Sequence, residues 1–325
     1  MHKTFDENHL VSIVIPVYKN EDNLPELVQS LSLIKARLFS PIEVVFVIDG
    51  SPDKSWEWLT NNNDLRQLCL CRFILLSRNF GALAAVRRGI REASGDVICV
   101  IAADGQEPPA LVLEMVAPIV YENVEVVVGI RERRADSVST RFFSNVFWMT
   151  FRLLGGRELP RRGVDVFAIS ARVAKLLNDY KESSTSLIGL IYWSGFNRRE
   201  VPYTRVKRSI GRSSWTFKKR AKYALDSITS FSEVPIAILV VLGVLGFVVS
   251  SVFGAVVLVA QLLWSNSPPG YTPLLLGLSF VSSTQLFGMG ILGMYIWRIS
   301  ENVRGRPATI DWKLISTYPD QDSLD

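Results

Sequence analysis

The sequence predicts an α/β domain built on a doubly wound, mostly parallel sheet, followed by a membrane-associated segment. Strand-like and helix-like runs alternate from residue 11 to about residue 170, which is typical of βαβ units. The strand-like runs are apolar almost throughout, as expected of strands covered on both faces. Further along, no charged residue lies between Glu233 and Arg298. A water-exposed surface needs charges, so a simple soluble globule is excluded.

Six short runs rich in β-branched residues predict strands at 11–17, 42–48, 73–76, 96–101, 124–130 and 164–169. Helices are predicted to begin at Leu24-Pro25 and Pro108-Pro109, to run over 79–93, and to follow a cap at Ser170. Proline suits the first turn of a helix because its missing N–H has no partner there. Gly95 is expected to end the helix that is predicted at 79–93.

The C-terminal part contains two apolar stretches, at 234–264 and 273–297, which are joined by a turn at 265–270. Each is long enough to cross a bilayer as a helix. Basic residues precede the first stretch and follow the second, so the positive-inside rule places both flanks in the cytoplasm. The stretch at 218–231 is predicted to form an amphipathic helix in the headgroup plane. The alternative is a buried helical hairpin within a large soluble protein.

The basic charge of the chain is concentrated in one segment. The net charge is +5, but ten Lys and Arg residues and one Glu lie between Arg198 and Lys222. This placement favours a membrane surface or a phosphorylated ligand over nucleic acid. The only histidines are His2 and His9, and the three cysteines form no CxxC pair. Histidine-based triads, histidine-ligated zinc and disulfides are therefore not expected.

Polar, turn-forming segments follow four consecutive predicted strands. They are IPVYKNE at 15–21, IDGSPD at 48–53, SRNFG at 77–81 and AADGQEPP at 102–109. In open α/β sheets, ligands bind at the carboxyl ends of the strands. The sequence therefore predicts a ligand site built from these four segments.

These four segments, in this order and followed by two apolar helices, resemble glycosyltransferase family 2, with its nucleotide-binding GT-A fold. The resemblance covers about residues 11–215 and is to the branch that transfers a sugar to a polyisoprenyl phosphate. It implies a polar tail at 1–10, a catalytic domain at 11–204, a basic donor loop and juxtamembrane helix at 205–232, two transmembrane helices at 233–298 and a cytoplasmic tail at 299–325.

The resemblance implies that the donor nucleotide contacts Asp49, Pro16, Tyr18, Glu21 and Ala103. A carboxylate after a buried strand can accept hydrogen bonds from a base or ribose, which suits Asp49. The alternative role of Asp49 is that of a turn aspartate that caps the helix near Asp53.

Asp104 stands where the family carries a DxD metal motif, but Ala102 replaces the first acid. The resemblance implies that Asp104, with the amide oxygen of Gln106, holds Mg²⁺ or Mn²⁺ against the donor diphosphate. Magnesium often takes only one or two protein carboxylates, so the loss of one is tolerable. The alternative role of Asp104 is that of a helix N-cap before Pro108.

The resemblance also implies acceptor-phosphate contacts by Arg131, Arg141 and Ser144, because arginine offers bidentate, permanently charged donors. Asp165 is the one carboxylate in an otherwise apolar strand, where burial would raise its pKa. It is expected to act as a base or to orient the acceptor. A phosphate monoester is already anionic at neutral pH, however, so it hardly needs a base. The alternative is an acceptor for backbone N–H groups.

The segment at 208–215 resembles the family's RxxGxSKW/Y loop, which closes over the donor, with Ser214 where lysine is usual. Arg208 is expected to contact the donor phosphates. The alternative is a basic run that binds anionic lipid.

The sequence thus predicts an inverting transferase that moves a sugar from a UDP-sugar to undecaprenyl phosphate at the cytoplasmic face of the inner membrane. One alternative is a processive polysaccharide synthase, although its QxxRW motif and additional spanning helices are missing from the sequence. Another is a degenerate, non-catalytic membrane partner, suggested by Ala102 and Ser214. Glycines at 243, 246, 288, 290 and 293 would let helices of two copies pack closely, which leaves a homo-oligomer open.

Overall fold

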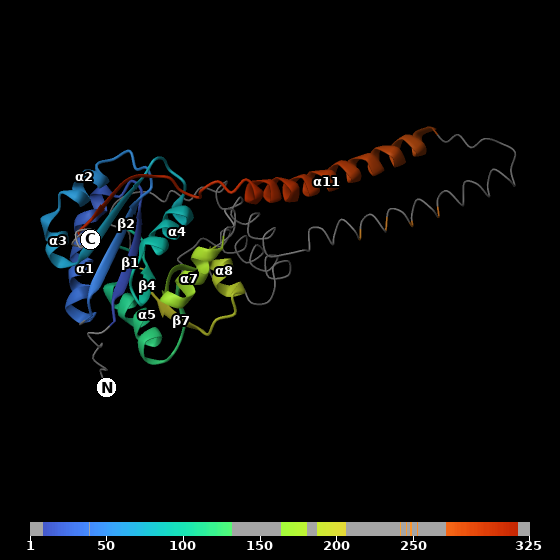
Figure 1. Cartoon of the computed structure of the whole chain (residues 1–325). Helices are drawn as coiled ribbons and strands as arrows, with labels where there is room; N and C mark the ends of the chain where they lie inside the picture. Colours follow the sequence, from blue (N-terminus) through green and yellow to red (C-terminus); the bar gives the residue numbers. More distant parts are fainter. Residues whose placement is uncertain are drawn as a thin grey trace, which may run out of the picture.

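The computed structural model describes residues 9–38, 40–131, 164–180, 187–205 and 271–317, together with Val241, Leu245, Val248 and Val252. Most of these residues form one sheet with helices on both faces. A long C-terminal helix projects away from this α/β body (Figure 1).

The described strands form an eight-stranded sheet in the order β7-β5-β6-β4-β1-β2-β3-β8. Their bounds are β1 Val11–Val17, β2 Ile42–Ile48, β3 Leu70–Leu76, β4 Val97–Val100, β5 Val126–Arg131, β6 Val164–Ser170, β7 Arg198–Tyr203 and β8 Asp311–Ser316. The helices are η1 Glu21–Asn23, α1 Leu24–Leu38, α2 Ser55–Thr60, α3 Asn63–Leu68, α4 Ala82–Glu92, α5 Pro109–Tyr121, α7 Ala171–Asp179, α8 Leu187–Trp193 and α11 Tyr271–Val303.

The sheet is mostly parallel, as predicted, but mixed: six of the eight described strands run in one direction, and β6 and β8 run in the other. The four strands β3-β2-β1-β4 run parallel, as predicted, and β7 runs parallel to β5. Strand β6 runs antiparallel to both of its neighbours, and β8 runs antiparallel to β3. A strand buried on both faces has the same apolar pattern in either direction, so the sequence pattern could not reveal the reversal of β6.

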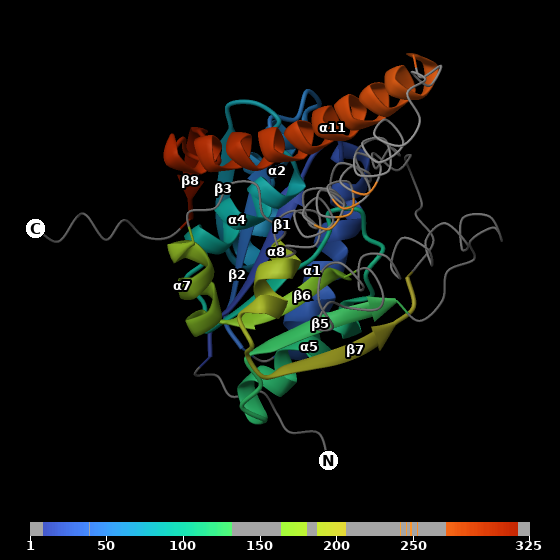
Figure 2. The ribbon, with the colours of Figure 1, turned by 90° about the vertical axis from the view of Figure 1, so that its right-hand side faces the viewer.

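The two faces of the sheet carry separate hydrophobic cores. Helices α1, α2, α3 and α5 contribute to one core, and α4, α7 and α8 to the other. In Figure 2, α4, α7 and α8 lie in front of the sheet and α1 and α5 lie behind it. Close packing of α4 depends on Gly89, because a Cβ there would lie 2.3 Å from a methyl carbon of Val14. Ser170 caps α7, as predicted, by accepting a hydrogen bond from the N–H of Val173 at 3.3 Å.

The C-terminal region contains the helix α11 and the edge strand β8. The second predicted apolar helix lies within α11, whereas most of the first lies outside the described residues. Searched for membrane spans, the described part of the chain yields no helix that is long and apolar enough to qualify. Strand β8, which the sequence analysis did not predict, brings Ile315 into register with Phe73 of β3.

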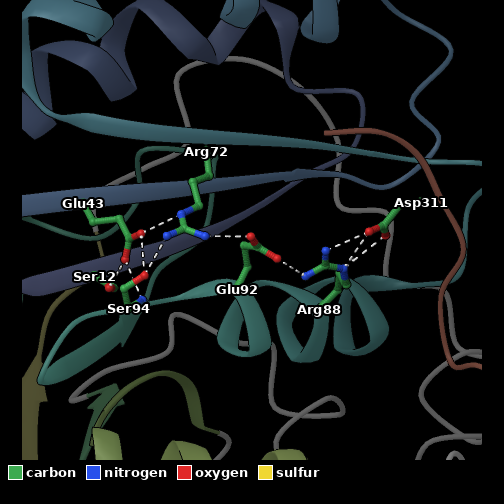
Figure 3. Close-up of polar contacts among 7 residues, drawn as sticks. All are labelled: Ser12, Glu43, Arg72, Arg88, Glu92, Ser94 and Asp311. Carbon is green, nitrogen blue, oxygen red and sulfur yellow. Dashed lines mark hydrogen bonds and ion pairs between the residues drawn. The ribbon is translucent and has the colours of Figure 1, made fainter. Parts of the chain in front are cut away.

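A chain of charged side chains connects β8 to the centre of the sheet (Figure 3). Asp311 of β8 pairs with Arg88 of α4 at 2.7 Å, and Arg88 pairs with Glu92 at 2.7 Å. Glu92 also pairs with Arg72 of β3 at 2.7 Å, and Arg72 pairs with the fully buried Glu43 of β2 at 2.9 Å. This charged chain joins residues that are far apart in the sequence.

The position of Glu92 in this chain predicts a pH dependence of stability. Burial alone would raise the pKa of Glu92, but the hydrogen bonds and charges of Arg88 and Arg72 outweigh it and lower the pKa. The stabilisation is therefore complete above the ordinary glutamate pKa of 4.5 and is lost as the pH falls through the lower pKa of the folded state. Denaturant midpoints measured from pH 7 to pH 3 should fall less steeply for Glu92→Gln than for wild type. The exposed Glu114→Gln should retain the wild-type slope, and equal slopes for all three proteins would contradict the prediction.

Candidate active site

The carboxyl ends of β1, β2 and β4 meet at one edge of the sheet, because these strands are parallel neighbours with β1 in the middle. The loop after β1 is tied to the loop after β2 by three hydrogen bonds. The N–H of Glu21 donates to Asp53 at 3.1 Å, and the N–H of Lys54 donates to the Glu21 carboxylate at 3.0 Å. The N–H of Lys19 donates to the Ser51 hydroxyl at 2.8 Å. The carboxylate of Glu21 therefore organises the start of α2, and its predicted contact with the donor stays a prediction.

Asp53 is one of the three acceptors that hold these two loops together. Burial would raise its pKa, but hydrogen bonds from Ser51, Ser55 and the Glu21 backbone outweigh burial and lower it. Asp53 is therefore ionised at neutral pH. Of the other residues predicted to line the donor pocket, Pro16 and Tyr18 are half-buried at the end of β1, and Ala103 is buried after β4.

Asp49 lies directly after β2 with only 2% of its surface exposed. Its two carboxylate oxygens accept hydrogen bonds from the N–H groups of Phe80 at 2.7 Å and Gly81 at 2.8 Å, just before α4. Burial raises the pKa of Asp49, and these bonds and the charge of Arg78 oppose the rise only in part. Gly50 has φ +55°, and a Cβ there would lie 2.3 Å from the carbonyl carbon of Arg78. Asp49 thus fixes the loop after β3, and its contact with the donor nucleotide stays a prediction.

Replacing Asp49 by Asn should destabilise the protein by about 1–3 kcal/mol, because the amide NH₂ would face a backbone N–H and leave that donor unpaired. The exposed Asp22→Asn in η1 is the matched control and should stay within about 0.5 kcal/mol of wild type. Denaturation of the full-length proteins, followed by tryptophan fluorescence, measures both. Equal stability of the two variants would contradict the role given to Asp49.

A second charged group lies after β4 and contains the predicted metal ligand Asp104, which is 6% exposed. One oxygen of Asp104 accepts a hydrogen bond from the N–H of Gln106 at 3.3 Å. The other oxygen pairs with Arg205 at 3.1 Å. The same nitrogen of Arg205 lies 3.6 Å from the carboxylate of Glu107. One guanidinium thus bridges two buried carboxylates.

Glu107 is the most deeply buried acid of this group. Burial and then the charge of Asp104 raise its pKa to about 7, while Arg205, the backbone of Ala102 and Arg131 oppose the shift. The pKa of Glu107 therefore lies near physiological pH.

Arg131 ends β5 in register with Tyr203, which ends the neighbouring strand β7. Burial raises the pKa of Tyr203, and the neighbouring Arg131 opposes this. The structure therefore brings Arg131, predicted to bind the acceptor phosphate, to the same edge of the sheet as Asp104. Binding of phosphate by Arg131 stays a prediction.

Several predicted site residues are not described. Arg141, Ser144 and Arg208 lie outside the described residues, and Asp165 is placed on β6 without its side chain. Over the described ranges, no group of three or more His, Cys, Asp or Glu side chains could hold a metal ion. Asp104 and Gln106 nevertheless offer a carboxylate and an amide oxygen, which are donors that suit Mg²⁺ or Mn²⁺ when phosphates and waters complete the shell.

Three residues of this site were not predicted from the sequence: Glu107, Tyr203 and Arg205. Glu107 follows Asp104 by three positions, and this short spacing was the signal in the sequence that could have indicated it as a site residue. Tyr203 and Arg205 depend on β7, whose mixed sequence RREVPY has no strong alternation and contains Pro202. Only the pairing of β7 with β5 reveals that Arg205 lies near Asp104.

Comparison with known proteins identifies the class of this fold and site. Residues 12–181 match the family described as Glycosyl transferase family 2. A protein of Bacillus subtilis described as uncharacterized glycosyltransferase YkcC is 32% identical over 302 residues, which is 92% of each chain. The chain therefore belongs to glycosyltransferase family 2 and is a glycosyltransferase.

Among the similar proteins is one with a stated substrate. The undecaprenyl-phosphate 4-deoxy-4-formamido-L-arabinose transferase of Serratia proteamaculans is 29% identical over 317 residues, which is 96% of each chain. Among solved structures, mannosyl-3-phosphoglycerate synthase from Rubrobacter xylanophilus has a TM-score of 0.46 and 13% identity, covering 67% of this chain and 71% of that one. Likeness at that level says nothing about the residues of the site.

Proposed function

We propose that this glycosyltransferase moves a sugar, with inversion, from a nucleotide-sugar to undecaprenyl phosphate or a similar polyisoprenyl phosphate. A UDP-sugar such as UDP-glucose is the proposed donor. The observation that carries the proposal is the likeness to an undecaprenyl-phosphate sugar transferase over 96% of both chains. That likeness spans the α/β body and the C-terminal helix alike.

The proposed chemistry combines residues at the edge of the sheet with predicted site residues that lie outside the described part of the chain. The acceptor phosphate, held by Arg131 with Arg141 and Ser144, attacks the anomeric carbon while the bond to the nucleoside diphosphate breaks. Asp165 orients the acceptor, and Arg208 contacts the donor phosphates. A Mg²⁺ or Mn²⁺ ion on Asp104 and Gln106 would neutralise the departing diphosphate. Positioning and preorganised charge thus supply most of the catalysis.

We further propose that the protein lies in the bacterial inner membrane through two helices, with the catalytic domain in the cytoplasm. The stretch without charged residues between Glu233 and Arg298 supports this location. So do the apolar side chains that α11 exposes, among them Leu274, Leu278 and Ile296, each about two-thirds exposed. A polyisoprenyl phosphate acceptor would keep its hydrocarbon tail in the bilayer while its phosphate reaches the edge of the sheet.

A panel of radiolabelled nucleotide-sugars tests the proposal. Full-length protein in membranes is incubated with each donor, Mg²⁺ and undecaprenyl phosphate, and the product is extracted into organic solvent. One donor should give a lipid-linked product that carries a single sugar. A polymer would favour the processive synthase, and no turnover of any donor would favour the non-catalytic partner.

A further inference from the structure

Arg205 pairs with the carboxylate of Asp104, which the proposed function assigns to the metal. Its terminal nitrogen lies 3.1 Å from Asp104 and 3.6 Å from Glu107. The side chains of Asp104 and Glu107 are 6% and 3% exposed, whereas that of Arg205 is 26% exposed. A partly exposed cation therefore covers two buried carboxyl groups.

This arrangement has a consequence for metal binding. A divalent ion coordinated by Asp104 would lie close to the guanidinium, and two cations repel at such a distance. Arg205 follows the end of β7 by two residues and is more exposed than its partners, so it is the member of this group that can turn outward. The donor diphosphate brings the negative charge that would attract both the ion and a displaced guanidinium.

We infer that Arg205 is a displaceable counterion, which holds Asp104 in the empty enzyme and moves to the donor diphosphate when metal and donor bind together. Arg205 is thus a positioning residue that makes metal binding depend on the nucleotide. The inference rests on the proposed function, because it takes Asp104 as the metal ligand.

The test is direct measurement of Mn²⁺ binding to the full-length protein, by electron paramagnetic resonance, with and without UDP. Wild type should bind Mn²⁺ weakly alone and much more tightly with UDP. Arg205→Gln should bind Mn²⁺ alone at least about tenfold more tightly than wild type, because the competing charge is gone. In the same variant, UDP should raise the affinity for Mn²⁺ by a smaller factor than in wild type, because the coupling between the two ligands depends on Arg205.

Two further variants separate the role of Arg205 from general effects on folding. Arg205→Lys keeps the positive charge and should keep Mn²⁺ binding without UDP close to wild type. Arg199→Gln removes a half-exposed arginine of β7, which pairs with Glu122, and should change neither measurement. Thermal melting confirms that each variant is folded, and if Arg205→Gln does not fold, Arg205→Ala replaces it.

The outcomes distinguish this inference from the proposed function. If Arg205→Gln binds Mn²⁺ alone no more tightly than wild type, while UDP still promotes Mn²⁺ binding in wild type, the inference is wrong and the proposed function stands. If neither wild type nor the variants bind Mn²⁺ with or without UDP, the metal site on Asp104 is wrong and the inference with it, while the radiolabelled donor panel decides separately whether the protein transfers sugar.

Discussion

Asp104→Asn should lose at least about 10²-fold in kcat/KM for sugar transfer while the protein remains folded. On the proposed function, the variant removes the one carboxylate of the metal motif, since Ala102 replaces the other acid. Metal stabilisation of a departing diphosphate is worth several kcal/mol, and about 1.4 kcal/mol corresponds to a factor of ten in rate. The variant also removes the charge that pairs with Arg205.

The matched control is Asp64→Asn, which changes an exposed aspartate in the first turn of α3. It should retain wild-type kcat/KM. Initial rates are measured with the donor identified by the radiolabelled panel, and thermal melting checks the fold. Full activity of Asp104→Asn would remove Asp104 from the mechanism.

Replacing Arg72 by Met should destabilise the protein by about 3–5 kcal/mol. Glu43 is fully buried, and Arg72 is the cation 2.9 Å from it. Removing one partner of a buried ion pair leaves the other charge uncompensated, which costs roughly this amount. The loss also interrupts the chain of charges that runs through Glu92 and Arg88 to Asp311 (Figure 3).

Arg172→Met provides the comparison. Arg172 pairs with Glu125 at 3.5 Å and its side chain is 76% exposed, so this variant should lose no more than about 1 kcal/mol. The double variant Glu43→Gln with Arg72→Met should regain much of the loss, because the uncompensated charge is gone while the side-chain oxygen at position 43 can still accept the hydrogen bond from the N–H of Ser94. Denaturant unfolding of the full-length proteins measures all three. Equal losses from Arg72→Met and Arg172→Met would show that the buried pair contributes no more to stability than the exposed pair.

The elements at the centre of the fold were predicted well from the sequence, because local sequence patterns determine where they begin and end. Strands β1 and β2 have the predicted bounds, and α1 and α5 begin at or within a residue of the predicted prolines. These elements have continuous apolar runs or clear start signals. The reversal of β6 and the presence of β7 and β8 depend on pairing between distant residues, which no local pattern records. Strand β8 is exposed at all six positions, so it has no buried face to predict it.

In the candidate site, too, the positions of residues could be predicted from the sequence, whereas their contacts could not. Asp49, Glu21 and Asp104 follow recognisable strands, and the structure places all three at the edge of the sheet where the predicted site lies. Their hydrogen bonds to Gly81, Lys54 and Gln106 could not be predicted, because they depend on how the loops fold. The pairing of Arg205 with Asp104 joins positions 101 residues apart and becomes visible only in three dimensions.

The late position of β8 in the chain bears on how the protein is made. The strand that completes the β3 edge follows α11, so it leaves the ribosome only after the α/β body and the long helix. Domains generally fold as units during synthesis, but here the α/β body waits for a partner on the far side of the long helix. Until β8 has been synthesised, β3 presents an unpaired edge, which is the kind of surface that neighbouring nascent chains can join.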